Sequence, residues 1–221
     1  MPTQAEPKSD LEPIAGDQLA AMIDPKTTAL LVVDAQVDFI APEGPWAKAG
    51  FDLSSVPPAL EKANRLADVA REAGATVVYI RVITSPDTDS DALKNFYTRR
   101  GFPLETIAIC RRGTPGADYY GVDPQPGDMH VEKVLFSSFY GTDFEERLRE
   151  RGIDTLVVTG FTTDCCVDST VRDAFHRGFN VFLVGDACAA SPPSRHETSL
   201  IAILKNTALL TQTDDVLAAW S

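Results

Sequence analysis

The 221-residue chain contains little histidine, cysteine or tryptophan, and it has fewer basic than acidic residues. Its four cysteines are too few for a disulfide scaffold, and its three histidines offer little imidazole for catalysis or metal binding. No apolar run approaches the roughly 18 residues of a membrane-spanning helix. The polar first residues also lack the layout of a signal peptide. We therefore expect a cytoplasmic protein.

The charge balance narrows the possible partners. Thirty-two acidic against 20 basic residues give a formal net charge of −12. A chain this acidic has no general attraction for phosphate backbones or anionic lipids. We therefore expect neither nucleic acid nor a membrane as a partner. Hydrophobic residues at 44% and charged residues at 24% are ordinary for a globular domain, and the length suits a single domain with a large core.

Apolar runs of strand length alternate with helical patterns from residue 28 onward. The predicted strands are 28–34, 76–82, 129–134, 155–159, 180–184 and 208–211. The predicted helices are 57–73, 143–151, 166–177, 194–205 and 214–220. This alternation with short links predicts an α/β fold: a three-layer α-β-α sandwich of Rossmann type, with a mostly parallel sheet.

The domain organisation is simple. Residues 1–27 contain four prolines and no apolar periodicity, so we predict an N-terminal arm with at most a short helix near 18–22. Residues 28–221 are predicted to form one domain. Within it, residues 84–127 are rich in Gly, Pro and Asp and are predicted to be mostly irregular. Such a long segment often lines a pocket or an interface.

Three reactive side chains lie at or near the carboxyl ends of predicted strands, where open α/β sheets place their sites. Asp34 ends the first strand, Lys133 lies near the end of the third, and Cys166 begins the helix after the fourth. A helix N-terminus favours a thiolate and supplies backbone donors to an oxyanion. Together the three residues offer a base, a charge partner and a nucleophile. From the residues alone, Cys165 is an alternative nucleophile.

Three motifs extend this arrangement. They are Leu-Leu-Val-Val-Asp34-Ala-Gln36-Val-Asp38-Phe39, Lys133-Val-Leu-Phe-Ser-Ser138-Phe139-Tyr-Gly-Thr142, and Gly160-Phe-Thr-Thr-Asp-Cys-Cys166-Val-Asp-Ser-Thr-Val-Arg-Asp-Ala174. In this order and spacing the chain resembles the isochorismatase-like cysteine hydrolases, from about residue 28 to residue 217. The resemblance implies that family's fold and an Asp–Lys–Cys catalytic triad at Asp34, Lys133 and Cys166.

The resemblance implies further site features. It favours Cys166 over Cys165 as nucleophile, a cis peptide between Phe161 and Thr162, and an oxyanion hole formed by the N–H groups of Thr162 and Cys166. Five other positions are candidates for substrate binding. These are Phe39, Phe139 and Tyr140, for which core packing is the alternative, Gln212 just past the last strand, and Gln36 in the first motif.

The same resemblance bears on the reaction. Nicotinamidases of this family bind a metal through histidines after the first strand, whereas residues 41–55 contain no histidine. We therefore expect no metal and no cofactor. Cys166 favours hydrolysis of a C–N bond in a small amide or ureide, such as biuret, a ureidoacrylate or a carbamoyl amide, releasing ammonia or an amine.

Several alternatives to this reaction stay open. They are a nicotinamidase, a maleamate-type amidase, an isochorismate-type vinyl ether hydrolase and a catalytically silent binding protein. The resemblance also implies a homodimer or homotetramer. Arg111 and Arg112 could meet a substrate carboxylate or could form a solvated pair.

Overall fold

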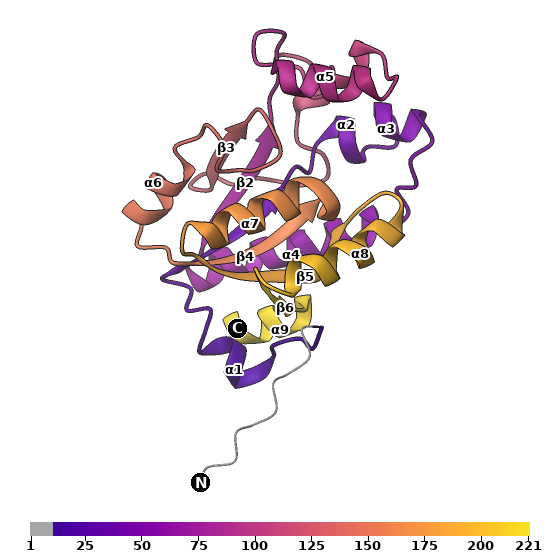
Figure 1. The fold of residues 1–221 in the computed structure, drawn as a ribbon. Helices are drawn as coiled ribbons and strands as arrows, with labels where there is room; N and C mark the ends of the chain where they lie inside the picture. Colours follow the sequence, from indigo (N-terminus) through magenta and orange to yellow (C-terminus); the bar gives the residue numbers. More distant parts are fainter. Residues whose placement is uncertain (1–10) are drawn as a thin grey trace.

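Six parallel strands form the central sheet of the computed structural model, which describes residues 11–221 (Figure 1). The strands lie in the order β3-β2-β1-β4-β5-β6. Their bounds are β1 (Thr28–Val33), β2 (Thr76–Val82), β3 (Met129–Lys133), β4 (Thr155–Phe161), β5 (Asn180–Ala189) and β6 (Leu209–Thr211). All paired strands are parallel. The predicted α/β fold is therefore confirmed, with a sheet that is parallel throughout.

Helices cover both faces of the sheet (Figure 1). One face packs against α6 (Phe144–Glu150), α7 (Asp168–His176) and α8 (Pro193–Leu204). The other packs against α1 (Gly16–Ala20), α4 (Val56–Ala73) and α9 (Thr213–Trp220). The short helices α2 (Val37–Ile40) and α3 (Pro45–Lys48) and the helix α5 (Asp91–Arg99) lie beyond the end of the sheet where β1 and β2 finish.

The local sequence explains why β1 and α4 form. All six residues of β1 are buried, as expected for a central parallel strand covered on both faces. In α4, Ala59, Ala63, Leu66 and Ala70 recur at helical spacing and are buried. Gly74 ends this helix at φ +82°, a left-handed backbone that glycine adopts without steric cost.

The segment 84–127 is mostly irregular, as predicted, with three short structured pieces. It contains α5, η1 (Leu104–Ile107) and η2 (Pro115–Ala117), the last two being short 3₁₀ turns. Ser90 caps α5, because its Oγ accepts a hydrogen bond from the N–H of Leu93 at 3.2 Å. This capping serine was the available sequence signal for the helix.

The predicted arm requires a correction. Its described part, residues 11–27, packs into the domain: Leu19 and Ile23 are fully buried. The N–H of Ile14 donates to the Leu210 carbonyl at 2.7 Å, and the Trp220 indole donates to the Ile23 carbonyl at 2.8 Å. Buried apolar side chains thus pack α1 against the C-terminal helix α9, so the domain begins before residue 28. Residues 1–10 lie outside the described part.

Within residues 11–221, no helix combines the length and apolar character needed to cross a membrane. This finding agrees with the absence of long apolar runs in the sequence.

The docked N-terminal segment should contribute to stability. Leu19→Ala should lower the free energy of unfolding by about 2–4 kcal/mol, since a fully buried leucine is lost. Met22→Ala, at a side chain 42% exposed, should cost less than about 1 kcal/mol. Urea denaturation measures both variants. Equal, small losses would show that this segment is a dispensable arm.

Candidate active site

Asp34 and Lys133 form a completely buried ion pair. The strands that carry them, β1 and β3, flank β2 on its two sides, so their carboxyl ends converge. Lys133 Nζ lies 2.8 Å from Asp34 Oδ2, and neither side chain is exposed. The same ammonium donates to the Leu135 carbonyl at 3.0 Å. Asp34 has φ +52°, a left-handed conformation that aspartate tolerates better than most residues and that often marks functional positions.

Cys166 reaches this pair through a specialised turn. The peptide between Phe161 and Thr162 is cis, as the resemblance implies. One π-helical turn, η3 (Thr163–Val167), then precedes α7. The N–H groups of Cys165 and Val167 both donate to the Thr162 carbonyl at 3.1 Å, which leaves the Cys166 N–H between them outside this pattern.

Gly160 allows β4 to approach β1 closely enough for this arrangement. It has φ +119°, and a Cβ at this position would collide with the backbone of Val33. Val33 directly precedes Asp34, so the close approach brings the turn that carries Cys166 against the carboxylate. Only glycine satisfies both the backbone angle and the space.

The three reactive groups act on one another. Burial raises the pKa of Asp34, although the charge of Lys133 and a hydrogen bond with Cys166 oppose it. The pKa of Lys133 is also raised, because the charges of Asp34 and Cys166 outweigh the effect of burial. Asp34 Oδ1 is buried without a partner of good hydrogen-bond geometry among residues 11–221, so the nearby thiol is the group that can engage it.

The ionisation of Cys166 differs from the expectation of a thiolate. A hydrogen bond with Cys165, burial and the negative charge of Asp34 raise the pKa of the Cys166 thiol well above its ordinary value. The opposing charge of Lys133 is smaller in effect. These influences act against the thiolate that a helix N-terminus favours.

Comparison with known proteins agrees with this geometry. The model of the isochorismatase domain matches residues 28–215. The chain belongs to the isochorismatase family.

Individual relatives specify the branch. Ureidoacrylate amidohydrolase RutB of Methylobacterium radiotolerans is 36% identical over 208 residues, covering 87% of this chain and 76% of the relative. A cysteine hydrolase from Pseudomonas syringae pv. phaseolicola superposes with a TM-score of 0.79 at 28% identity, covering 90% of this chain and 94% of that one. N-carbamoylsarcosine amidase from Thermoplasma acidophilum gives a TM-score of 0.67 at 27% identity, with coverages of 85% and 97%.

Gln36, one of the five candidates for substrate binding, has a structural role instead. Its Nε2 donates to the carbonyls of Val82 and Ala117, both at 2.9 Å, and its Oε1 accepts from the Val82 N–H at 2.7 Å. The side chain is fully buried. Both amide hydrogens are used, so Gln36 holds the 115–119 loop to β2 and is not open to a substrate.

Phe139 likewise packs in the core. It is 4% exposed, and its ring centroid lies 4.9 Å from Phe144 and 5.8 Å from Phe179. This is the alternative considered for it. The prediction that Phe139 binds substrate is therefore corrected, because Phe144 of α6 and Phe179, just before β5, cover its ring.

The other three candidates stand in different surroundings. Phe39 is half-buried on α2, with its ring 4.9 Å from that of Trp46. Tyr140 is 57% exposed in the loop after β3. Gln212 precedes α9 at the end of β6, and β5 separates that strand from β4. Within residues 11–221, none of these three makes a hydrogen bond or ion pair with the buried triad, so their substrate role stays a prediction.

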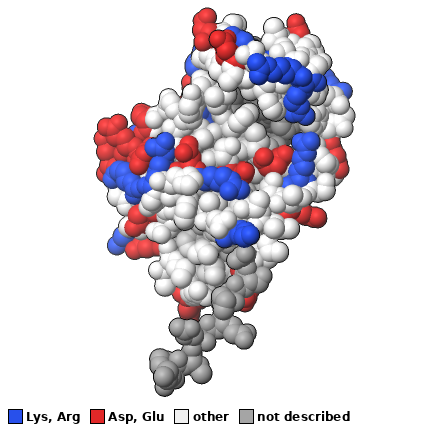
Figure 2. Space-filling view, viewed as in Figure 1, with Lys and Arg blue, Asp and Glu red and all other residues white. Residues whose placement is uncertain are grey.

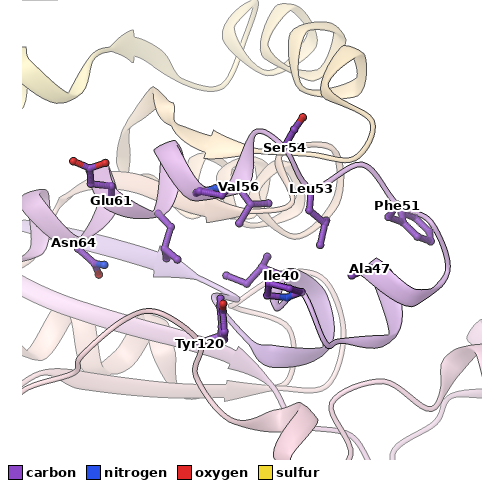
Figure 3. A pocket seen from close by; sticks show the side chains of 12 residues that line it. Ile40, Ala47, Phe51, Leu53, Ser54, Val56, Glu61, Asn64 and Tyr120 are labelled. Atoms are coloured by element: carbon purple, nitrogen blue, oxygen red, sulfur yellow. The ribbon is translucent and has the colours of Figure 1, made fainter.

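A cavity of about 640 Å³ lies apart from the triad (Figure 3). Mostly apolar side chains line it, among them Ile40 of α2, Leu53, Val56 of α4 and Tyr120. It contains none of the three reactive residues. This groove belongs to the face covered by α4, whereas Cys166 belongs to the core on the α7 face.

The sequence did not single out two neighbours of the turn. The Thr163 hydroxyl and His196 Nδ1 of α8 lie 2.8 Å apart, which ties η3 to α8. Tyr97 of α5 is close enough to Cys165 and Cys166 for their charges to act on it. Nothing in the spacing of residues 84–127 reveals that α5 returns to this end of the sheet.

In residues 11–221 no cluster of three His, Cys, Asp or Glu side chains is arranged to hold a metal ion. The side chains gathered at this site supply a thiol, a carboxylate and an ammonium group.

The buried ion pair predicts a strong effect of removing one partner. Lys133→Met should cost about 3–5 kcal/mol of unfolding free energy, because it leaves Asp34 as an unpaired buried charge. Adding Asp34→Asn should recover part of that loss. The control is Lys62→Met, which breaks a more exposed pair with Asp186 and should cost about 1 kcal/mol or less. Denaturant melts that give Lys133→Met and Lys62→Met the same cost would contradict this picture.

Proposed function

We propose that the protein hydrolyses the C–N bond of a small ureido or carbamoyl compound through an acyl intermediate on Cys166. The observation that carries this proposal is the buried Asp34–Lys133 pair in contact with the Cys166 thiol. A ureidoacrylate amidohydrolase and an N-carbamoylsarcosine amidase among its relatives support the class of bond. The enzyme is thus an amidohydrolase acting on non-peptide C–N bonds.

In the first half of the reaction Asp34 acts as a base. It takes the proton of the Cys166 thiol, and the sulfur forms a bond to the substrate carbonyl carbon. The N–H groups of Thr162 and Cys166 stabilise the oxyanion. As the intermediate collapses, the C–N bond breaks and the leaving nitrogen takes the proton from Asp34. The product is an amine or ammonia, and the acyl group stays on sulfur.

In the second half water replaces the amine. Asp34, again a carboxylate, takes one proton from water while the water oxygen attacks the acyl carbon. The C–S bond then breaks, and Asp34 returns the proton to Cys166. For a carbamoyl substrate the released acid is a carbamic acid, which decomposes to ammonia or an amine and carbon dioxide. Lys133 keeps Asp34 ionised for each transfer and offsets the negative charge that develops on sulfur.

The neighbouring cysteines provide a matched test of the nucleophile. Cys166→Ala should lower turnover of 3-ureidopropionate by at least about 10³-fold, because the covalent route is lost. Cys165→Ala should keep activity within about tenfold. Ammonia release measures both, and acid-quenched peptide mapping should find the acyl group on Cys166. Survival of activity in Cys166→Ala with loss in Cys165→Ala would reverse the assignment.

The raised pKa of Asp34 predicts the acid side of the pH profile. Asp34 must be ionised to accept the thiol proton, and burial raises its pKa. We therefore expect kcat/KM to fall, as pH decreases, with a midpoint above the value of about 3.9 typical of aspartate. Circular dichroism at each pH separates this loss from unfolding. A midpoint at or below that typical value would contradict the role of Asp34 as the base.

A further inference from the structure

The α5 segment forms a cap at the end of the sheet where the reactive residues converge (Figure 1). Both ends of the segment are fixed. Arg111 binds Asp89 through two hydrogen bonds of 2.7 and 2.6 Å, and Asp38 Oδ2 accepts from the Cys110 N–H at 2.6 Å. The helix itself buries no residue fully. Its side chains are therefore at least partly accessible.

Tyr97 of this helix lies within electrostatic range of Cys165 and Cys166. It is half-buried, and its ring packs edge-on against Phe96 and Phe102, with centroids 5.4 and 5.9 Å away. Burial raises the pKa of its phenol, and the charges of Cys165 and Cys166 add to this effect. A phenol that stays protonated at neutral pH can donate a hydrogen bond.

Arg100 lies next to that phenol. Its guanidinium sits 5.1 Å from the ring centre of Phe96 and 5.5 Å from that of Phe102, and its charge acts on Tyr97. Among the described residues, no carboxylate pairs with Arg100. Three other arginines near this end of the sheet are paired, Arg111 with Asp89, Arg112 with Glu132 and Arg195 with Asp164, whereas Arg99 has no ion pair among the described residues.

The cap also reverses the charge of the protein locally. Residues 89–112 contain five basic side chains and three acidic side chains, a balance of +2 in a chain whose net charge is −12. Figure 2 shows Lys and Arg side chains at the α5 end of this face, above a hollow, with some Asp and Glu side chains beside them. A positive rim on an otherwise acidic protein concentrates small anions at this opening.

We propose that Tyr97 and Arg100 bind an anionic group, a carboxylate, at the far end of the substrate from the bond cleaved at Cys166. A guanidinium held over two rings loses little freedom when it engages a carboxylate, and the phenol donates a second hydrogen bond. The inference rests on the proposed function and makes it more specific. The preferred substrates are ureido or carbamoyl acids, and neutral ureides such as biuret are poorer.

The test compares two substrates that differ in one group, 3-ureidopropionate and propylurea, in which a methyl group replaces the carboxylate. Arg100→Ala should lower kcat/KM for 3-ureidopropionate about tenfold, mainly through KM, as expected for one charge-assisted hydrogen bond at a partly exposed site. Tyr97→Phe should lower it about threefold or more. Arg100→Lys should restore part of the loss, and turnover of propylurea should stay within about twofold in every variant.

Arg99→Ala is the matched control, because it removes the same charge from the same end of α5. Its effect on 3-ureidopropionate should stay within about twofold. An equal loss in Arg99→Ala and Arg100→Ala would overturn the subsite, since a general field would then explain both. An equal loss for propylurea in Arg100→Ala would also overturn it, since a disturbed cap would then be the cause.

Binding separates failure of the subsite from failure of the proposed function. In the Cys166→Ala background, calorimetry should show 3-ureidopropionate binding weakened about tenfold by Arg100→Ala. If the wild-type protein releases no ammonia from either compound, the proposed function is wrong, while this binding difference still supports the anion subsite. Binding that Arg100→Ala leaves unchanged overturns the subsite whatever the turnover shows.

Discussion

The Asp34–Lys133 ion pair is the interaction on which the rest of the site depends. Removing both charges from water carries a penalty of several kcal/mol per ion, which only close geometry and further hydrogen bonds offset. The sheet supplies that geometry, because β1 and β3 end on either side of β2 and the side chains meet at 2.8 Å. The Leu135 carbonyl takes another hydrogen of the ammonium. The pair is therefore built by the fold itself.

This pair also influences Cys166. A hydrogen bond with Cys165, burial and the charge of Asp34 raise the pKa of the Cys166 thiol, which favours its neutral form. Asp34 Oδ1 retains capacity to accept a proton. In the proposed reaction the thiol is thus deprotonated only as it attacks, and the negative charge passes between carboxylate, sulfur and oxyanion within one buried group of atoms. Gly160 and the turn after it are required because they bring Cys166 into that group.

Much of the fold follows from local sequence, because buried parallel strands are continuous apolar runs. The strand 76–82 matches β2, and Asp34, Lys133 and Cys166 were found because reactive groups follow such runs. Contacts between distant segments could not be read in this way. Gln36 donates a hydrogen bond to the 115–119 loop, and Leu19 of α1 packs against α9. No local sequence pattern reveals either partner.

The expected thiolate illustrates a different limit. A helix N-terminus does favour a negative charge, but a hydrogen bond with Cys165, burial and the charge of Asp34, 132 positions earlier in the chain, raise the pKa of the Cys166 thiol. The sequence likewise does not indicate that α5 lies near Cys165 and Cys166, because no local pattern links residues 91–99 to that turn.

One titration tests the central claim most directly. It follows the ultraviolet absorbance of thiolate against pH, in the wild-type protein minus that in Cys166→Ser. The neutral-thiol account predicts that no difference appears until well above the ordinary thiol pKa of about 8.5. A full thiolate difference at pH 7 would contradict it.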